Sequence, residues 1–203
     1  VSSDDLPPYD EALLRREMSL FHDWFLQLLC EIELSPAQQD SWQRINRELV
    51  DNALAQPQVF VHRDYHSRNL MRLESGNPGI LDFQDAVRGP LTYDLVSLLR
   101  DCYVRWPPER VDGWVGEYFR AASSAGLLGA TDEATFREWF DLMGVQRHLK
   151  AAGIFARLNH RDGKPGYLAD IPRTLGYIVE VGRRVPSMGD LGDFVRRRVL
   201  SRL

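Results

Sequence analysis

Two short polar stretches at a fixed spacing constrain this chain more than any other feature of its sequence. The first stretch, VFVHRDYHSRNLM, contains His62, Asp64 and Asn69, and the second, GILDFQDA, places Asp82 thirteen residues after Asn69. Side chains that act together on a loop need a rigid scaffold to hold them in position. We therefore expect the chain to adopt a fold that brings these two stretches together.

The residues around these stretches predict a strand, a loop and a hairpin. Residues 59–61 form a β-branched and aromatic run, which is typical of a strand. The segments 69–72 and 79–81 flank a turn of glycine, asparagine, serine and proline, which predicts a hairpin. Residues 62–68 then belong to a loop, and we expect Asp82 at the end of a strand.

The oxygen-bearing side chains of this pattern occur in the order that phosphoryl transfer requires. In such sites one carboxylate faces the acceptor hydroxyl, while an amide oxygen and a second carboxylate hold Mg²⁺ against the phosphates of ATP. We assign Asp64 as the catalytic base, and Asn69 and Asp82 as the magnesium ligands. A short pattern also arises by chance, but the predicted strand, loop and hairpin follow the order that the chemistry needs.

Three further residues are predicted to support these loops. The His62 imidazole is expected to hydrogen-bond the backbone near Asp82 and brace the loop rather than to react. Asp85 is either a second metal ligand or a carboxylate that braces its loop. Asp94, at the start of a predicted helix, favours a scaffold role because a carboxylate there is stabilised by the helix dipole.

Four polar residues in the same loops are candidates for substrate or phosphate contacts. They are His66, Arg68, Gln84 and Arg88. The two arginines have an alternative, because guanidinium groups pair with neighbouring carboxylates as often as with phosphate.

Two parts of an ATP site have no counterpart before the motif. A glycine-rich loop and a lysine normally contact the nucleotide phosphates, yet the lysines of this chain are Lys150 and Lys164, both downstream of the motif. Arginine is a poor replacement because its planar fork differs in reach and hydration from an ammonium group. We therefore expect the acceptor and metal side of a kinase without its nucleotide lobe, so that ATP binds through a part this chain lacks and the isolated chain is inactive.

Composition narrows the class of protein further. With 203 residues, 44% hydrophobic and 27% charged, the chain has the size and balance of one globular unit, and we predict a single domain over 1–203. A net charge of −4 without a basic stripe argues against nucleic acid, and no apolar run is long enough for a membrane. Cys30 and Cys102 lack a CxxC partner, so reduced thiols and a cytoplasmic location are expected. The chain does not begin with Met, and we expect it to be part of a longer protein.

Outside the motif, apolar residues recur at helical spacing. Ser35, Pro36 and Gln38 predict a capped helix start. The other predicted helices cover residues 8–32, 95–106, 111–125, 133–158, 171–183 and 191–203, with a long loop at 161–166. The predicted fold class is mainly α with a small β-hairpin island (α+β).

The sequence HRDYHSRNL followed by ILDFQDAVRGPLTYDLVSLL resembles the aminoglycoside phosphotransferase and choline kinase-like family. Members of that group show a pattern similar to HGDLHxxN, then IDFxDA and YDL. The likeness extends from about residue 8 to the C-terminus and is specific between 59 and 99. Together with the following RDCYVRWP, these segments look closest to the bacterial anomeric kinases of N-acetylmuramate and N-acetylglucosamine that serve cell-wall recycling.

This resemblance implies the larger, C-terminal lobe of a protein-kinase-like fold. It also implies Asp64 as base, Asn69 and Asp82 as magnesium ligands, ATP as co-substrate and an amino-sugar hydroxyl as the acceptor. Two alternatives stay open, a non-catalytic kinase-like binding module and an aminoglycoside antibiotic kinase. The basic C-terminal sequence RRRVLSRL disfavours a cationic acceptor, and an intact Asp64, Asn69 and Asp82 disfavours the binding module.

Overall fold

A computed structural model describes residues 6–203, and it is mainly helical, as predicted. The start of the expected domain at residue 1 lies outside the described residues. The α-helices are α1 (Glu11–Leu20), α2 (Pro36–Ala55), α3 (Tyr93–Leu99), α4 (Pro108–Ser124), α5 (Glu133–Asp162), α6 (Ile171–Gly182) and α7 (Gly189–Phe194). The strands are β1 (Gln58–Val61), β2 (Leu70–Met71), β3 (Gly79–Ile80) and β4 (Val87–Pro90).

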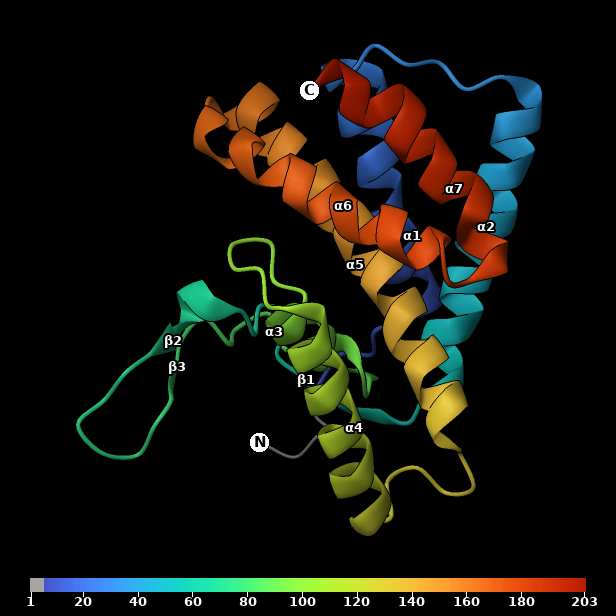
Figure 1. Cartoon of the computed structure of the whole chain (residues 1–203). Coiled ribbons are helices and arrows are strands. Elements are labelled where there is room, and N and C mark those ends of the chain that lie inside the picture. The colour runs from blue at the N-terminus through green and yellow to red at the C-terminus, as the bar shows by residue number, and fades with distance from the viewer. Residues whose placement is uncertain (1–5) are drawn as a thin grey trace.

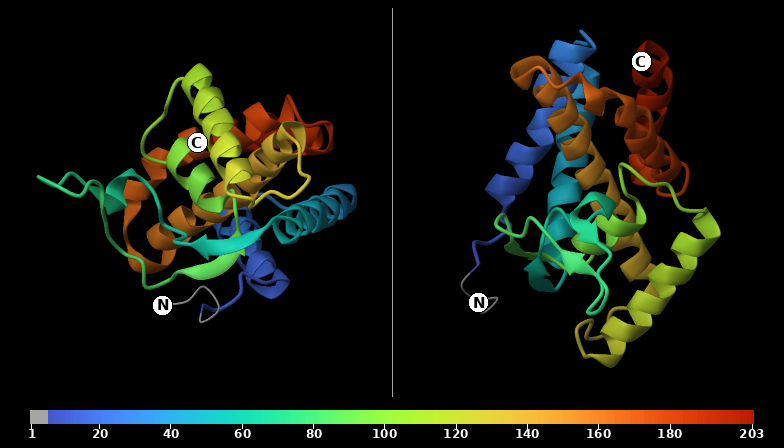
Figure 2. Two further views of the ribbon diagram at one scale, coloured as in Figure 1. Left: turned by 90° about the horizontal axis from the view of Figure 1, so that it is seen from below. Right: turned by 90° about the vertical axis from the view of Figure 1, so that its left-hand side faces the viewer.

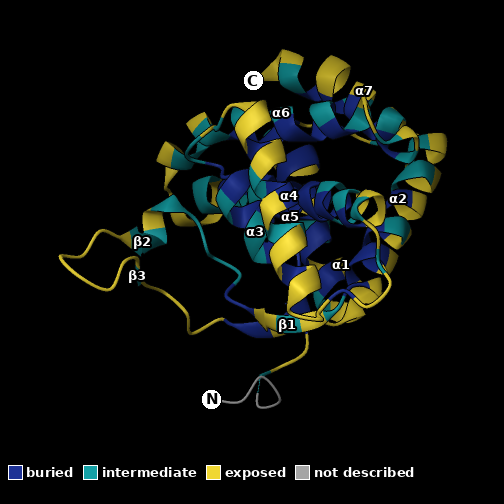
Figure 3. Cartoon of the chain, turned by 60° about the horizontal axis from the view of Figure 1, so that its bottom comes forward, coloured by how far each residue is buried: buried dark blue, intermediate teal, exposed yellow. Residues whose placement is uncertain are grey.

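The long helix α5 is the centre of the fold, and α1, α2, α3 and α6 pack around it (Figure 1). Its middle turns are buried on all sides, as the dark blue ribbon in Figure 3 shows. At Gly153 a methyl group would lie 2.4 Å from the backbone of Leu20. The absence of a side chain there lets α5 approach the N-terminal helix closely.

The predicted helix over residues 8–32 is present in two parts. It begins as α1, whose N-cap Asp10 accepts a hydrogen bond from the backbone N–H of Leu13 at 2.8 Å. From Phe21 to Leu29 it continues with wider, π-type turns. The second predicted helix is confirmed as α2, and Ser35 and Gln38 form the expected capping box.

Two small antiparallel sheets carry the loops of the motif. The predicted hairpin is confirmed, with Leu70 opposite Ile80 in the β2–β3 pair. The strand β4 was not predicted; it pairs with β1 and places Val61 opposite Val87. The strands β1 and β4 lie side by side in the left view of Figure 2. The β2–β3 hairpin projects away from the body with an exposed tip (Figure 3).

Several helix ends differ from the prediction. The helix predicted over 95–106 ends at Leu99, and α4 starts at Pro108 instead of residue 111. The predicted loop over 161–166 is shorter, because α5 continues to Asp162 and a 3₁₀ turn covers Pro165–Asp170. The last predicted helix is divided into α7, a π-type turn (Val195–Val199) and a 3₁₀ turn (Leu200–Arg202).

No helix between residues 6 and 203 combines the length and apolar character needed to cross a bilayer. Cys30 and Cys102 are both buried and free, as expected for reduced thiols.

Candidate active site

The loop that follows β1 carries Asp64 and is anchored to α3. Both carboxylate oxygens of Asp94 accept backbone hydrogen bonds, from the N–H of His62 at 2.7 Å and from that of Arg63 at 3.1 Å. Burial raises the pKa of the Asp94 carboxyl above its ordinary value, although these two bonds lower it. Asp94 thus fixes the backbone immediately before Asp64.

Asp101 holds the far end of the same loop, and it is not among the site residues predicted from the sequence. Its side chain is buried and accepts the backbone N–H of Ser67 at 2.9 Å and that of Tyr103 at 2.8 Å. These bonds form a turn directly after α3, which explains why this helix ends before residue 106. In the sequence, Asp101 is recognisable only as a charged residue that directly follows the apolar helical pattern of residues 95–99.

The backbone carbonyl of Asp64 organises the rest of the loop. It accepts the backbone N–H of His66 at 2.9 Å and the side-chain amide Nδ2 of Asn69 at 3.0 Å. With its amide nitrogen engaged in this bond, Asn69 has its side-chain oxygen available for another partner. The main chain of Asp64 and the side chain of Asn69 are therefore held in a fixed relation.

The β2–β3 hairpin brings Asp82 beside Asn69. The backbone N–H of Leu81 donates to the carbonyl of Asn69 at 3.0 Å, so Asp82 is one residue from this pairing. Asp82 has a left-handed backbone with φ of 70°, and Gln84 Nε2 donates to its Oδ1 at 3.1 Å. Strained non-glycine residues of this kind concentrate at functional sites.

Asn69 and Asp82 offer oxygen atoms of the kinds that Mg²⁺ prefers, one from an amide and one from a carboxylate. No group of three or more His, Cys, Asp or Glu side chains with metal-binding geometry occurs among the described residues. Mg²⁺ does not need such a group, because it is usually held by one or two carboxylates with water and phosphate oxygens completing its octahedron. One carboxylate and one amide oxygen on an exposed edge match that requirement.

The other predicted residues lie around these groups but make different contacts. The bracing bond expected from the His62 imidazole is absent among the described residues, since both buried ring nitrogens lack a partner there. The physical reason is that Asp94 already holds this part of the loop through backbone N–H groups. Asp85 contributes its backbone carbonyl, which accepts from Arg63 Nη1 at 3.3 Å.

The two candidate arginines of the loops differ in position. The Arg68 guanidinium lies 3.7 Å from the centre of the Tyr103 ring and 3.9 Å from a carboxylate oxygen of Asp170. Arg88 lies on β4, where its backbone pairs with the segment before α1. Arg68 is therefore near the loop of Asp64, whereas Arg88 belongs to the small sheet.

A buried ionic cluster supports the Asp64 loop from behind. Glu17 on α1 pairs with Arg63 and lies 3.0 Å from Lys150 Nζ, and it accepts a hydrogen bond from Tyr9. Burial alone would raise the pKa of the Glu17 carboxyl, but Lys150 and Arg63 hold it below its usual value. The sequence signal was that Glu17 lies on the apolar face of its helix, beside Leu14 and Met18.

A cavity of about 100 Å³ opens beside Asp64, between the loop and α5. Its lining includes His66, Tyr103, Arg147 and Lys150. Burial and the nearby Arg147 lower the pKa of His66 below its ordinary value. The candidate acceptor side of the site therefore has a wall made largely of cationic and aromatic groups.

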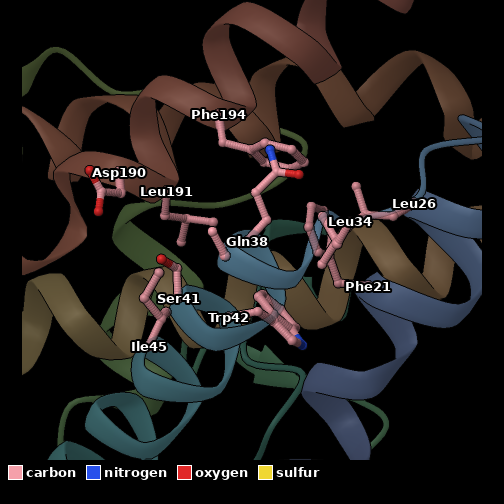
Figure 4. A pocket seen from close by; sticks show the side chains of 11 residues that line it. Phe21, Leu26, Leu34, Gln38, Ser41, Trp42, Ile45, Asp190, Leu191 and Phe194 are labelled. Atoms are coloured by element: carbon pink, nitrogen blue, oxygen red, sulfur yellow. The ribbon is translucent and has the colours of Figure 1, made fainter.

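A larger cavity of about 240 Å³ lies elsewhere in the fold, between α2, α7 and the helical turns of Phe21–Leu29. Figure 4 shows its mainly apolar side chains, which include Trp42, Leu191 and Phe194. None of the predicted site residues lines it. Its polar side chains are limited to Gln38, Ser41 and Asp190, and it lies apart from the loop that carries Asp64.

Comparison with known proteins gives a family and several relatives. Residues 2–139 match the model of a family described as phosphotransferase enzyme family. Proteins named N-acetylmuramate/N-acetylglucosamine kinase are similar to this chain. The one from Pseudomonas putida is 52% identical over 94% of this chain and 56% of its own length. Those from Pseudomonas aeruginosa and Neisseria meningitidis are 50% and 49% identical, over 94% and 92% of this chain and 56% and 55% of their own lengths. The chain thus spans about half the length of these relatives.

Proposed function

The chain belongs to the phosphotransferase enzyme family, and we propose that it is the acceptor-binding and catalytic lobe of an ATP-dependent sugar kinase. The proposed reaction moves the γ-phosphate of ATP to a hydroxyl of an amino sugar, N-acetylmuramate or N-acetylglucosamine, in cell-wall recycling. The relatives that match 94% of this chain carry both sugars in their names. The observation that carries the proposal is the convergence of Asp64, Asn69 and Asp82 through one hairpin and one anchored loop.

In this proposal each residue has one task. Asp64 accepts the proton of the acceptor hydroxyl and orients that oxygen toward the phosphate. Asn69 and Asp82 would hold Mg²⁺, which supplies positive charge to the phosphate oxygens when bound. The anchoring of the loop by Asp94 and Asp101 keeps the base in position before substrate arrives, which is how an active site lowers the cost of orientation.

We propose that the remaining contacts to ATP come from a lobe outside this chain. Apolar side chains are exposed around the Asp82 loop, including Met71, Ile80 and Phe83. A cluster of exposed apolar residues is typical of an interaction surface. The relatives have nearly twice the length matched here, and a nucleotide lobe in that additional length would cover this face.

A cytoplasmic location belongs to the same proposal. Phosphoryl transfer needs ATP, and the free thiols of Cys30 and Cys102 suit a reducing compartment. No nucleic-acid or membrane partner is proposed.

The identity of the acceptor is tested with a full-length protein. This is a protein that contains this chain together with the part that its relatives have in addition. Transfer of phosphate from ATP to N-acetylmuramate, N-acetylglucosamine and kanamycin is compared at equal concentrations. We expect turnover of the two acetylated sugars. Turnover of kanamycin alone would establish an aminoglycoside kinase instead, and binding without any turnover would establish a non-catalytic module.

A further inference from the structure

Arg147 is a buried cation that forms no ion pair within the described part of the chain. It lies on α5 with 5% of its surface exposed, and its Nη1 contacts Cys102 Sγ at 3.6 Å. Its Nε has no hydrogen-bond partner, and no carboxylate lies within ion-pair distance of it among residues 6–203. Burying an unpaired charge costs several kcal/mol, so a guanidinium in this state indicates a missing anion.

The carboxylates near Arg147 are engaged elsewhere. Both oxygens of Asp101 accept backbone N–H groups, from Ser67 and Tyr103. Asp94 is likewise used by the loop that carries Asp64. Asp101 still acts on Arg147 through its charge, but it forms no ion pair with the guanidinium, whose free N–H groups are left for a group that enters from outside.

The cavity beside Asp64 gives such a group access to Arg147. Three cations line it, Arg147, Arg63 and Lys150, but the last two share the single carboxylate of Glu17 behind the wall. Asp64 is the one carboxylate in the lining. The lining of the cavity thus carries an excess of positive charge.

The size of the cavity indicates which part of a ligand would enter it. Its volume of about 100 Å³ is smaller than the ~150 Å³ cavity that holds a benzene molecule in an engineered protein. It therefore has room for a short carboxylate-bearing arm but not for a pyranose ring, which would stay at the mouth near Asp64. Ile154 and Phe155 give the cavity an apolar side for the carbon atoms of such an arm.

We propose that Arg147 binds the carboxylate of the acceptor and is the residue that selects N-acetylmuramate. This inference rests on the proposed function. N-acetylmuramate is N-acetylglucosamine with an added lactyl ether, and that ether carries the carboxylate. A guanidinium donates two parallel N–H groups to a carboxylate. Because the Arg147 guanidinium is already buried, a carboxylate that reaches it strengthens binding of the anionic sugar. The neutral sugar lacks this contact.

The two sugars form a matched pair for the test. In the full-length protein, Arg147→Met should lower kcat/KM for N-acetylmuramate about 100-fold, in the range expected when one partner of a buried charge pair is removed. For N-acetylglucosamine kcat/KM should stay within about threefold. Arg147→Lys keeps the positive charge but lacks the two parallel N–H groups, so it should lower kcat/KM for N-acetylmuramate by an intermediate factor. The control is Arg161→Gln on the same helix, where the guanidinium is exposed and pairs with Asp162.

If Arg147→Met lowers kcat/KM equally for both sugars, or leaves kcat/KM for N-acetylmuramate unchanged, the inference is overturned. Calorimetric binding of N-acetylmuramate to the same proteins separates it from the proposed function, because binding requires no turnover. If no sugar is phosphorylated but the wild type binds N-acetylmuramate and Arg147→Met does not, the proposed reaction fails while the role of Arg147 stands. Equal binding by both proteins would contradict that role. Thermal unfolding checks that the variants fold.

Discussion

The backbone N–H of His62 donates a hydrogen bond to Oδ2 of Asp94 at 2.7 Å, and this contact joins the loop of Asp64 to α3. The other carboxylate oxygen accepts from Arg63. Since an asparagine has a single side-chain oxygen, Asp94→Asn would leave one of these N–H groups without its acceptor. We expect the free energy of unfolding to fall by about 1.5–3 kcal/mol.

The Asp94 prediction also extends to activity. A displaced loop misplaces Asp64, so kcat of the full-length protein should fall together with stability. Chemical denaturation and steady-state kinetics measure the two effects, and Asp51→Asn on the exposed face of α2 is the control. An Asp94→Asn protein with unchanged stability would show that these bonds do not hold the loop.

Glu17→Gln should be strongly destabilising, because it leaves Arg63 and Lys150 buried beside a neutral group. Breaking a buried ion pair from one side typically costs about 3–5 kcal/mol. Glu11→Gln on the same helix removes only an exposed pair with Arg15 and should cost under about 0.5 kcal/mol. Urea denaturation of both variants gives the comparison, and equal effects would refute the importance of the buried cluster.

His148 should make the fold sensitive to acid. The ring is buried against Tyr177, and Nε2 contacts the carbonyl oxygen of Arg100 at 2.8 Å; burial and the nearby Arg147 lower its pKa from 6.5 to about 3. The unfolded chain therefore binds a proton that the folded chain does not between pH 6.5 and 3. Stability from this group is complete above pH 6.5 and falls by about 1.4 kcal/mol per unit as pH decreases through that window.

Denaturation at several pH values between 6.5 and 3 tests whether the free energy of unfolding falls as pH decreases. His148→Gln removes the titrating group and should flatten the dependence on pH, whereas His160→Gln on the exposed end of α5 should leave it unchanged. The same slope in wild type and His148→Gln would assign the acid sensitivity to other groups.

Comparing Asp82→Asn with Asp85→Asn should show which of these two carboxylates binds Mg²⁺. Loss of an anionic ligand weakens Mg²⁺ binding, so we expect the Mg²⁺ concentration for half-maximal activity of the full-length protein to rise at least about tenfold. Asp85 uses its backbone carbonyl in the loop, and Asp85→Asn should change this concentration little. A similar rise in both variants would assign Asp85 as a second ligand.

The local features of the fold were predictable from the sequence. The capping box of α2 and the β2–β3 hairpin depend on residues that are close in the chain, and both are present as expected. The strand β4 was missed because Val87–Pro90 is short and ends in proline, and its partner β1 lies far before it. Such pairing is decided by tertiary packing, which periodicity does not report.

The contacts behind the loop were not predictable for the same reason. Asp101, Glu17 and Arg147 act on segments far away in the sequence, and each is a charged residue that is buried in the folded chain. In α5 the residues around Arg147 are buried on every side, so no polar face marks it as exposed or functional. Only the three-dimensional arrangement shows that Arg147 lies beside the cavity of Asp64.

The central claim is most directly tested by transfer of the γ-phosphate from ATP to N-acetylmuramate in the full-length protein and its Asp64→Asn variant. We predict a sugar phosphate as product of the wild type, with kcat lowered about 10³-fold in the variant and KM changed only a few-fold, since a general base acts mainly on the chemical step. An unchanged kcat in Asp64→Asn, or no sugar phosphate from the wild type, would contradict the account.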